Sequence, residues 1–381
     1  MRLLVLGAGL QGCACAYDLL QNPAVEQVTL ADLRPDRLPK FLAAGKWKGR
    51  LHTLRLDVSD STAVRTAFAG QAAVMSAIPY YYNGPMAKAA VEDGCHFSDL
   101  GGNTDIVLEQ KKLHQQALAQ GISVIPDCGL APGMVNILAA EGIRRLDTAE
   151  KVKIFVGGLP QSPEPPLNYQ IVYSLEGALD YYTTPSWVLR GGKPVQVEAL
   201  SEVESVEFPA PVGTLEAFHT GGGISTLPFA YQGKIDVMEY KTLRYPGHAA
   251  VVRPIRELGL LDNNPINVKG SKVVPRDLFI AAVSPKLSKP NGRDLVALQV
   301  QVTGKKHRKN RTITFRLLDF YDTRQGISAM MRTTGYSLSI TGQMQVDGRV
   351  TAKGVHTPDE AIPFAEYVKE LAKRGINIEE I

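Results

Sequence analysis

The residues near the start of the chain have the types and spacing that bind a dinucleotide. Gly7, Gly9 and Gly12 form a GxGxxG string directly after a short apolar run, and Asp32 follows 20 residues after Gly12. In such a loop the glycines allow a tight turn, the approach of a diphosphate to the backbone, and close packing of the next helix on the strand. The free N–H groups at the start of that helix attract phosphates. The pattern therefore predicts a dinucleotide site in which Asp32 holds the ribose hydroxyls.

The same residues favour NAD over NADP, because a carboxylate at position 32 would repel a 2′-phosphate. Arg34 lies two residues further on and could weaken this preference. Ligands of such sheets collect beyond the carboxyl ends of the strands, so more contacts are expected where later strands end. The alternative is that the glycines only end a strand in a domain that binds no nucleotide. The expected cofactor-binding residues are Gly7, Gly9, Leu10, Gln11, Gly12, Asp32, Asp57, Val58, Ser76, Ala77 and Pro79.

Polar residues able to do chemistry follow other predicted strands at the same edge. Asp99 precedes two glycines, and Asp127 lies in a segment rich in glycine and proline, which is typical of pockets. Each aspartate could instead cap the helix that follows it, because aspartate is favoured at that position. Cys128 is next to Asp127, but no histidine is near it in sequence, so packing is favoured over a nucleophilic role.

Composition favours a small molecule as the ligand. The chain of 381 residues has 42 Lys and Arg against 38 Asp and Glu, a net charge of +4, which gives no reason to expect nucleic acid or a membrane as partner. The one basic cluster, residues 305–311, lies between two strand patterns and predicts a solvated hairpin turn. The four cysteines lack the paired spacing of zinc or redox sites, so we expect no metal and a reduced, cytoplasmic compartment. No signal peptide or membrane span is predicted.

The elements that must position these residues change in character along the chain. Short apolar runs alternate with helical patterns over residues 1–135, which predicts an α/β Rossmann domain with a doubly wound parallel sheet. Over residues 136–350, strands separated by proline and glycine turns predict a second α+β domain with a mostly antiparallel sheet, for substrate binding and oligomerisation. Thr357 and Pro358 begin a helix expected over 357–375, which we expect to pack back on the first domain.

Seven separated strings together resemble the saccharopine dehydrogenase-like enzymes, and the branch most similar to this chain is L-lysine 6-dehydrogenase. This resemblance implies NAD-dependent oxidative deamination of the lysine ε-amine to allysine and ammonia, followed by cyclisation to a piperideine, as in lysine degradation. The saccharopine-reducing branch carries aspartate where this chain has Ala131, so an enzyme acting on the secondary amine of saccharopine is the second reading. The strings are Gly7 to Gly12, Asp99 to Gly102, Pro126 to Met134, Val156 to Pro160, Tyr173 to Gly177, Glu216 to Thr220 and Tyr240 to Tyr245.

The implied reaction assigns expected roles to several residues. A lysine amine has an unperturbed pKa of about 10.4, so a base or a desolvating pocket must help it lose its proton before hydride transfer. A proton acceptor must also activate the water that hydrolyses the imine, and a planar donor must hold the substrate carboxylate. The expected catalytic residues are Asp99, Asp127, His96 and Glu176, and the expected substrate-binding residues are Tyr80, Tyr173, His219, Thr220 and Arg244.

Some of these assignments have structural alternatives. Arg244, our choice for the carboxylate, could be a surface residue on an edge strand. His219 and Thr220 precede three glycines and could belong to a loop that closes over the substrate, or His219 could be structural. Tyr80 could be a packing aromatic. A catalytically inactive nicotinamide-binding sensor is the alternative from another functional class, and we expect a homo-oligomer, a dimer or higher.

Overall fold

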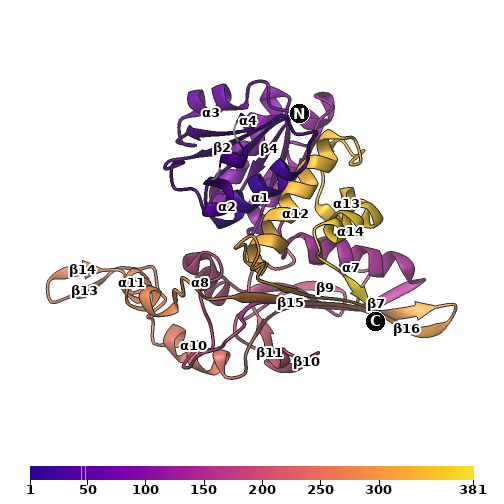
Figure 1. Cartoon of the computed structure of the whole chain (residues 1–381). Helices are drawn as coiled ribbons and strands as arrows, with labels where there is room; N and C mark the ends of the chain where they lie inside the picture. The colour runs from indigo at the N-terminus through magenta and orange to yellow at the C-terminus, as the bar shows by residue number, and fades with distance from the viewer. Residues whose placement is uncertain (44, 48) are drawn as a thin grey trace.

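The first of two sheets carries the dinucleotide loop. The structure, a computed structural model, describes residues 1–43, 45–47 and 49–381. Within these ranges the sheet has seven parallel strands in the order β17-β6-β5-β4-β1-β2-β3, which is the Rossmann order with one added strand (Figure 1). The predicted α/β fold is therefore confirmed. The strands are β1 (Arg2–Leu6), β2 (Gln27–Asp32), β3 (Leu51–Arg55), β4 (Ala73–Ser76), β5 (His96–Asp99), β6 (Ser123–Ile125) and β17 (Gly354–Val355).

Helices cover both faces of this sheet, as expected for strands that are apolar on both sides. Residues 3–6 of β1 and all of β4 are buried, and β4 carries no side chain that could face water. The N–H groups that start α3 and α5 are capped by the side chains of Asp60 and Asn103. The helices are α1 (Leu10–Gln21), α2 (Lys40–Ala43), α3 (Ser61–Phe68), α4 (Asn83–Asp93), α5 (Thr104–Lys111) and α6 (His114–Ala119), with 3₁₀ turns at Gly45–Trp47 and Tyr80–Tyr82.

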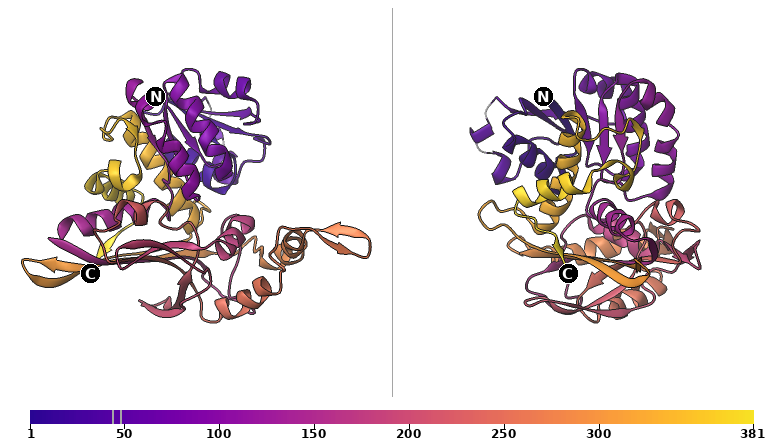
Figure 2. Two further views of the ribbon diagram at one scale, coloured as in Figure 1. Left: turned by 180° about the vertical axis from the view of Figure 1, so that it is seen from behind. Right: turned by 90° about the vertical axis from the view of Figure 1, so that its right-hand side faces the viewer.

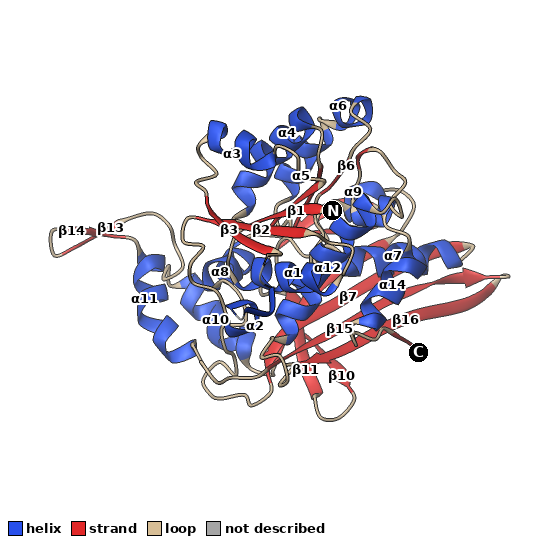
Figure 3. Cartoon of the chain, turned by 45° about the horizontal axis from the view of Figure 1, so that its top comes forward, coloured by secondary structure: helices blue, strands red, loops and turns tan. Residues whose placement is uncertain are grey.

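The second sheet lies below the first in Figures 1 and 3 and is mixed. Among the described strands of this second sheet, only β7 and β12 pair in parallel, so the prediction of a mostly antiparallel sheet is confirmed. The basic cluster forms the exposed turn of the β15–β16 hairpin, as predicted. The strands are β7 (Thr148–Pro160), β8 (Ser186–Arg190), β9 (Lys193–Val197), β10 (Glu204–Phe208), β11 (Gly213–His219), β12 (Val237–Arg244), β15 (Asp294–Lys306), β16 (Lys309–Phe320) and β18 (Glu379–Glu380).

The remaining elements of this part include an arm that extends to one side (Figure 2). The arm consists of α11 and the small β13–β14 hairpin, and α11 packs on α8. None of the helices in the described ranges is long and apolar enough to cross a bilayer. These elements are α7 (Met134–Arg145), α8 (Leu175–Thr183), α9 (Leu227–Ala230), α10 (His248–Glu257), α11 (Pro275–Leu287), β13 (Ile266–Val268) and β14 (Ser271–Val273).

The C-terminal part of the chain returns to the first sheet. Helix α12 (Ala329–Val346) runs between the two sheets and packs on α1, β4 and β5, although residues 329–346 fall within the expected second domain. The helix expected over 357–375 is divided into α13 (Pro358–Ala361) and α14 (Phe364–Lys373), because Pro363 cannot continue the hydrogen bonding of a helix. These two helices pack on α7, and α14 also packs on α12.

Candidate active site

A cavity of about 440 Å³ lies between the two halves of the molecule. One wall comes from the loops that follow β1, β4, β5 and β6 of the first sheet, and the other from α8 and β12. Its position at the carboxyl ends of parallel strands is the usual place for a ligand in such a fold. The lining includes Gln11, Ala77, Ile78, Pro79, Tyr80, Tyr81, Leu130, Ala131, Tyr173, Glu176, Asp180, Tyr181, Tyr240, Thr242, Arg244, Met330 and Thr334.

The glycine loop has the shape that a diphosphate requires. Gly7 has a φ of +95°, and a Cβ on Gly12 would collide with the carbonyl oxygen of Gly7, so both positions need glycine. No described atom lies within 4 Å of the place where a Cβ on Gly9 would stand, which leaves the start of α1 open. Asp32 ends β2, and its carboxylate accepts the N–H groups of Ala8 and Arg34, each at 2.8 Å. These residues fit a dinucleotide, with phosphates over Gly9 and a ribose near Asp32.

Other expected cofactor residues are distributed around this loop. Gln11 lines the cavity, and neither its amide nitrogen nor its amide oxygen has a hydrogen-bond partner among the described residues, although both atoms are buried. A ligand that meets this amide would remove a desolvation cost. Leu10 is 53% exposed. Ala77 and Pro79 line the cavity, whereas the Ser76 hydroxyl is buried and donates to Asn83 at 2.8 Å.

Two further cofactor candidates lie at the end of β3, away from the lining of the cavity. Asp57 is exposed and accepts the N–H and the hydroxyl of Ser59, at 2.9 and 2.7 Å. These hydrogen bonds from Ser59 lower the pKa of Asp57. Val58 is half-buried.

Asp99 is a buried carboxylate whose hydrogen bonds are satisfied. It accepts the backbone N–H of Gly101 at 2.7 Å, the N–H of Asp127 at 3.2 Å and the Gln110 amide at 2.6 Å. Burial raises its pKa to about 6, against the opposing effect of these donors. Asn103, and not Asp99, caps α5, so the alternative that Asp99 is a helix cap is wrong. Its contacts indicate that Asp99 ties together the ends of β5 and β6.

Asp127 is buried in a strained conformation without such partners. Its φ is +64°, and neither carboxylate oxygen has a regular hydrogen bond within the described ranges. Burial raises its pKa to about 7; the nearby Ser225 hydroxyl opposes this rise, and the charge of Asp99 adds to it. Helix α7 begins after Gly133, so Asp127 caps no helix. Cys128 is buried, and burial raises its pKa well above the usual range, which favours packing over nucleophilic chemistry.

Arg244 lies on β12, an interior strand, and is 3% exposed, so the alternative of a surface arginine on an edge strand is wrong. Its Nε donates to the Tyr182 hydroxyl at 3.1 Å, and its Nη1 donates to the Leu243 carbonyl at 2.8 Å. The Tyr182 hydroxyl lies 3.0 Å from Nε2 of His248, whose Nδ1 lies 3.0 Å from the Leu167 carbonyl. Burial and the charge of Arg244 lower the pKa of His248 to about 3, so its ring is neutral and accepts from Tyr182. No described residue accepts from Nη2, which leaves this nitrogen for a ligand.

Helix α8 supplies the charged residues of the opposite wall. Glu176 is exposed in its first turn, and Asp180 follows one turn later with its carboxylate 2.6 Å from Nη2 of Arg276. Arg244, Glu176 and Asp180 are the charged residues among those described in the lining. Tyr173 precedes the helix, and burial raises the pKa of its hydroxyl well above the usual range, so it is present as a neutral phenol.

Both halves of the molecule match models of one family. Residues 3–125 match the saccharopine dehydrogenase NADP binding domain, and residues 129–376 match the saccharopine dehydrogenase C-terminal domain. The chain belongs to the saccharopine dehydrogenase family. It is therefore an oxidoreductase that acts on amino acids and has a nicotinamide dinucleotide-binding domain. The resemblance drawn from the seven strings is confirmed at the level of the family.

Curated members of the saccharopine dehydrogenase family align with most of the chain. The chain is 23% identical to a saccharopine dehydrogenase [NADP(+), L-glutamate-forming] of Schizosaccharomyces pombe, over 86% of this chain and 88% of that protein. It is 24% identical to the mitochondrial alpha-aminoadipic semialdehyde synthase of Bos taurus, over 98% of this chain but only 47% of that longer protein.

Two solved structures share the fold. Apo saccharopine dehydrogenase (L-Glu forming) from Saccharomyces cerevisiae superposes with a TM-score of 0.81 at 22% identity, covering 100% of this chain and 99% of that one. The homospermidine synthase of Legionella pneumophila, in complex with NAD, has a TM-score of 0.70 at 10% identity, covering 100% and 91%.

The two histidines among the candidates lie away from the cavity of this saccharopine dehydrogenase relative. His96 begins β5, at the edge of the sheet opposite to Asp99, and its Nδ1 lies 2.9 Å from the Ser123 hydroxyl. His219 is fully buried at the end of β11, with Nδ1 3.1 Å from the Tyr240 carbonyl and Nε2 3.1 Å from Glu202. Burial lowers the pKa of both rings. Thr220 is buried, and its hydroxyl lies 2.7 Å from the hydroxyl of Thr242, which is one of the residues that line the cavity.

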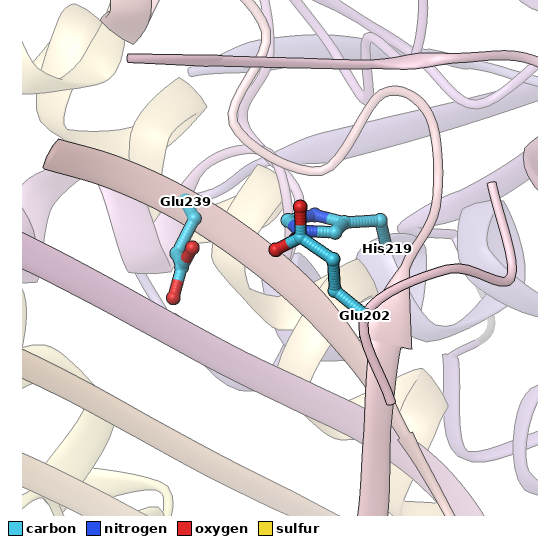
Figure 4. Close-up of side chains that lie close together, drawn as sticks. All are labelled: Glu202, His219 and Glu239. Atoms are coloured by element: carbon cyan, nitrogen blue, oxygen red, sulfur yellow. The ribbon is translucent and has the colours of Figure 1, made fainter. Parts of the chain in front are cut away.

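His219 belongs instead to a polar cluster on the second sheet, shown in Figure 4. Glu202, His219 and Glu239 place one ligand atom each within 4.8 Å of one another, which resembles a metal site. The Arg190 guanidinium already lies 3.0 Å from Glu202 and 2.7 Å from Glu239. Lys153 also lies 3.2 Å from Glu239. Because these cations balance the carboxylates, the cluster is an ion-pair network, and none of its three residues is among those that line the cavity.

Sequence reasoning missed several residues that surround the cavity. Asp180 and Tyr181 follow Glu176 by one turn of α8, a spacing that could have been read from the sequence once that helix was expected. Tyr182 and His248 act behind Arg244 and are separated from each other by 66 residues, so no local pattern connects them. Met330 and Thr334 come from α12, which the sequence did not indicate.

Proposed function

We propose that the protein is an NAD-dependent dehydrogenase that oxidises the ε-amine of L-lysine and releases ammonia. The observation that supports this most is the charge of the cavity, where Arg244 is the one described cation in the lining. Asp180 is paired with Arg276, so Glu176 is the free anion. A cavity with one free cation and one free anion fits an amino acid with one carboxylate and one α-ammonium, and an apolar stem between these groups and the reacting amine.

Each residue of the site has a separate role in this proposed reaction. Nη2 of Arg244 binds the α-carboxylate, and the Tyr182–His248 pair holds the guanidinium in place. Glu176 binds the α-ammonium. Asp127 is fully buried just before Gly129–Ala131 of the lining, and we propose it as the proton acceptor for the amine or for the water that hydrolyses the imine, since burial raises its pKa to about 7. A nicotinamide dinucleotide held by the Gly7–Gly12 loop and Asp32 would supply the acceptor for the hydride that leaves the carbon carrying the amine. In balance, the ε-ammonium form, water and oxidised dinucleotide give the aldehyde, the ammonium ion, reduced dinucleotide and one proton.

NAD is the proposed coenzyme because of Asp32. Its carboxylate is fixed at the end of β2 by two N–H donors and would oppose a 2′-phosphate. The saccharopine dehydrogenase of Schizosaccharomyces pombe is named as an NADP(+) enzyme, and Arg34 is exposed two residues after Asp32, so the screen below compares the two coenzymes.

A saccharopine dehydrogenase reaction is the second candidate, supported by the names of the relatives. Saccharopine has three carboxylates, and the single free cation in the described lining, together with Ala131, offers it few partners.

The test is a spectrophotometric screen in which lysine, ornithine and saccharopine are each tried with NAD and with NADP, and lysine with 2-oxoglutarate is tried with NADH and with NADPH, because joining lysine to the oxoacid consumes reduced dinucleotide. We expect reduction of NAD by lysine alone, faster at alkaline pH because the free amine reacts. Activity that requires saccharopine, or lysine plus the oxoacid, would assign the saccharopine reaction. Tight dinucleotide binding without turnover on the whole panel would instead favour a sensor.

A further inference from the structure

Arg276 is a buried arginine outside the described lining of the cavity, yet it contacts the helix that forms one wall of that cavity. It is 5% exposed at the start of α11, at the base of the arm. Its Nη2 donates to the Glu176 carbonyl at 2.7 Å and to the Asp180 carboxylate at 2.6 Å. One guanidinium thus contacts both residues of α8 that bring negative charge to the cavity.

Apolar packing between α8 and α11 does not determine the net charge that α8 presents to the cavity. Leu175, Leu179 and Tyr182 of α8 are buried in a cluster that also includes Ile280 and Val283 of α11. These contacts hold α8 against α11 whether or not Asp180 is neutralised. The ion pair adds a separate effect, because it removes one of the two free negative charges that would otherwise face the ligand.

The pair lies where the two halves of the molecule face each other. Tyr80 belongs to the opposite wall, and the pKa of its hydroxyl is raised by burial and next by the charge of Asp180, while Arg276 opposes the rise. Asp180 is itself a lining residue with 41% of its side chain exposed. A change in its net charge would therefore be felt by a ligand in the cavity.

We propose that Arg276 is a positioning residue that sets the substrate class of the cavity: by neutralising Asp180 it makes the enzyme select an amine that carries a carboxylate over a simple diamine. This inference rests on the proposed oxidation of a basic amino acid. With the pair intact, the unpaired charges that the described lining residues bring to the cavity are one cation, Arg244, and one anion, Glu176. Without Arg276, a second free anion would repel the carboxylate of lysine and attract the second ammonium of a diamine.

The experiment compares kcat/KM for L-lysine and for cadaverine, the diamine without the carboxylate, in four proteins and the wild type. Arg276→Gln should lower the lysine-to-cadaverine ratio about tenfold or more, mainly through the KM values. Asp180→Asn, at a half-exposed side chain, should raise the ratio or leave it unchanged. The double variant should return the ratio toward that of the wild type, and Arg276→Lys should keep it.

Controls separate this effect from loss of structure. The dinucleotide dissociation constant and the melting temperature should stay near the wild-type values in Asp180→Asn and Arg276→Lys. Equal loss of activity toward both substrates in Arg276→Gln, or a ratio within about twofold of the wild type in both single variants, would overturn the proposal. A fall of the ratio in Asp180→Asn would also overturn it. A wild type inactive on the whole panel overturns the proposed function and this inference together, whereas an active wild type with unchanged ratios overturns only the inference.

Discussion

Arg244 shows how a residue is oriented for a ligand by groups that never touch that ligand. Two of its nitrogens are occupied by Tyr182 and by a backbone carbonyl, and the His248 ring completes the chain of hydrogen bonds behind them. The Tyr169 ring also lies 4.9 Å from its guanidinium carbon. Because the side chain is fixed in advance, little conformational entropy is lost when a carboxylate binds.

Arg244→Lys tests this geometry, because lysine keeps the charge but not the planar donor group. We expect KM for the amino acid to rise about ten- to a hundredfold, as for the loss of a charged hydrogen bond, with dinucleotide affinity unchanged. Arg316→Lys is the matched control, since Arg316 also lies on a strand of the second sheet but bonds only to Gln299 among the residues described. Steady-state kinetics in which both variants behave alike would contradict the assignment.

Replacement of Asp127 by asparagine should change activity and stability in opposite directions. Its pKa is raised to about 7 by burial, above the value of about 3.9 in an unfolded chain. The native state then binds the proton more tightly than the unfolded state, so this group's contribution to stability falls as pH rises from about 4 to 7. Asp127→Asn should therefore melt at a higher temperature than the wild type at pH 8, by a margin that narrows toward pH 5.

The kcat/KM of Asp127→Asn should be lower than that of the wild type by about a hundredfold or more. Its rate should also no longer show the decline that the wild type shows below pH 7. Asp99→Asn is the comparison, because that carboxylate has three donors and should lose stability when replaced. If Asp127→Asn keeps the wild-type pH–rate profile, Asp127 is not the proton acceptor.

The residue types that sequence analysis could place were those set by local geometry. The role of glycines in a tight turn, or of a carboxylate at a strand end, depends on only a few neighbouring positions in the sequence. The loop from Gly7 to Gly12 accordingly has the expected shape. The histidines differ, because their environment depends on which end or face of a strand they occupy. His96 precedes Asp99 by only three positions, but these two residues are the first and the last of β5, so they lie at opposite ends of the strand.

At the scale of elements, α12 shows why one long helix was not expected. Fifteen of its 18 residues are buried, including both serines, both glutamines and two of its three threonines, so no polar face alternates with an apolar one. Two of its glycines allow the close approach, because a Cβ on Gly335 would lie 2.6 Å from the Gln11 carbonyl and one on Gly342 would collide with Met75. By contrast, α14 has one apolar side, and its region was expected to be helical.

The junction between β1 and α1 offers a matched pair of substitutions. Gly9→Ala meets no described atom within 4 Å, so the protein should keep its melting temperature but bind NAD more weakly, because the methyl group occupies the place of a phosphate. Gly12→Ala should lower the melting temperature, since its methyl group would press on the Gly7 carbonyl and move α1 off the sheet. Thermal unfolding and titration with NADH would check both; equal dinucleotide affinity in Gly9→Ala and the wild type would remove the support for a diphosphate at this loop.

At the scale of the whole molecule, the last part of the chain joins both halves around the cavity. Strand β17 pairs with β6 of the first sheet, and β18 pairs with β16 of the second. Arg374, which lies between these two strands in the sequence, donates to Asp18 of α1 at 2.6 Å, and Ser339 of α12 donates to the same carboxylate at 2.6 Å. The distance between the dinucleotide loop and Arg244 therefore depends on residues far from both in sequence, which is why motif spacing alone could not give the shape of the site.

Arg374→Met tests this closure. It would leave the Asp18 carboxylate, only 4% exposed, without its charged partner, and should lower the free energy of unfolding by about 3 kcal/mol. Lys112→Met is the control, because its ion pair with Glu109 is 70% and 61% exposed and should change stability by less than about 1 kcal/mol. Adding Asp18→Asn to Arg374→Met should recover part of the loss, because the uncompensated charge is then gone. Urea unfolding of the four proteins would measure these differences; a loss in Arg374→Met no larger than in the control would mean that α1, α12 and α14 are held together by apolar packing alone.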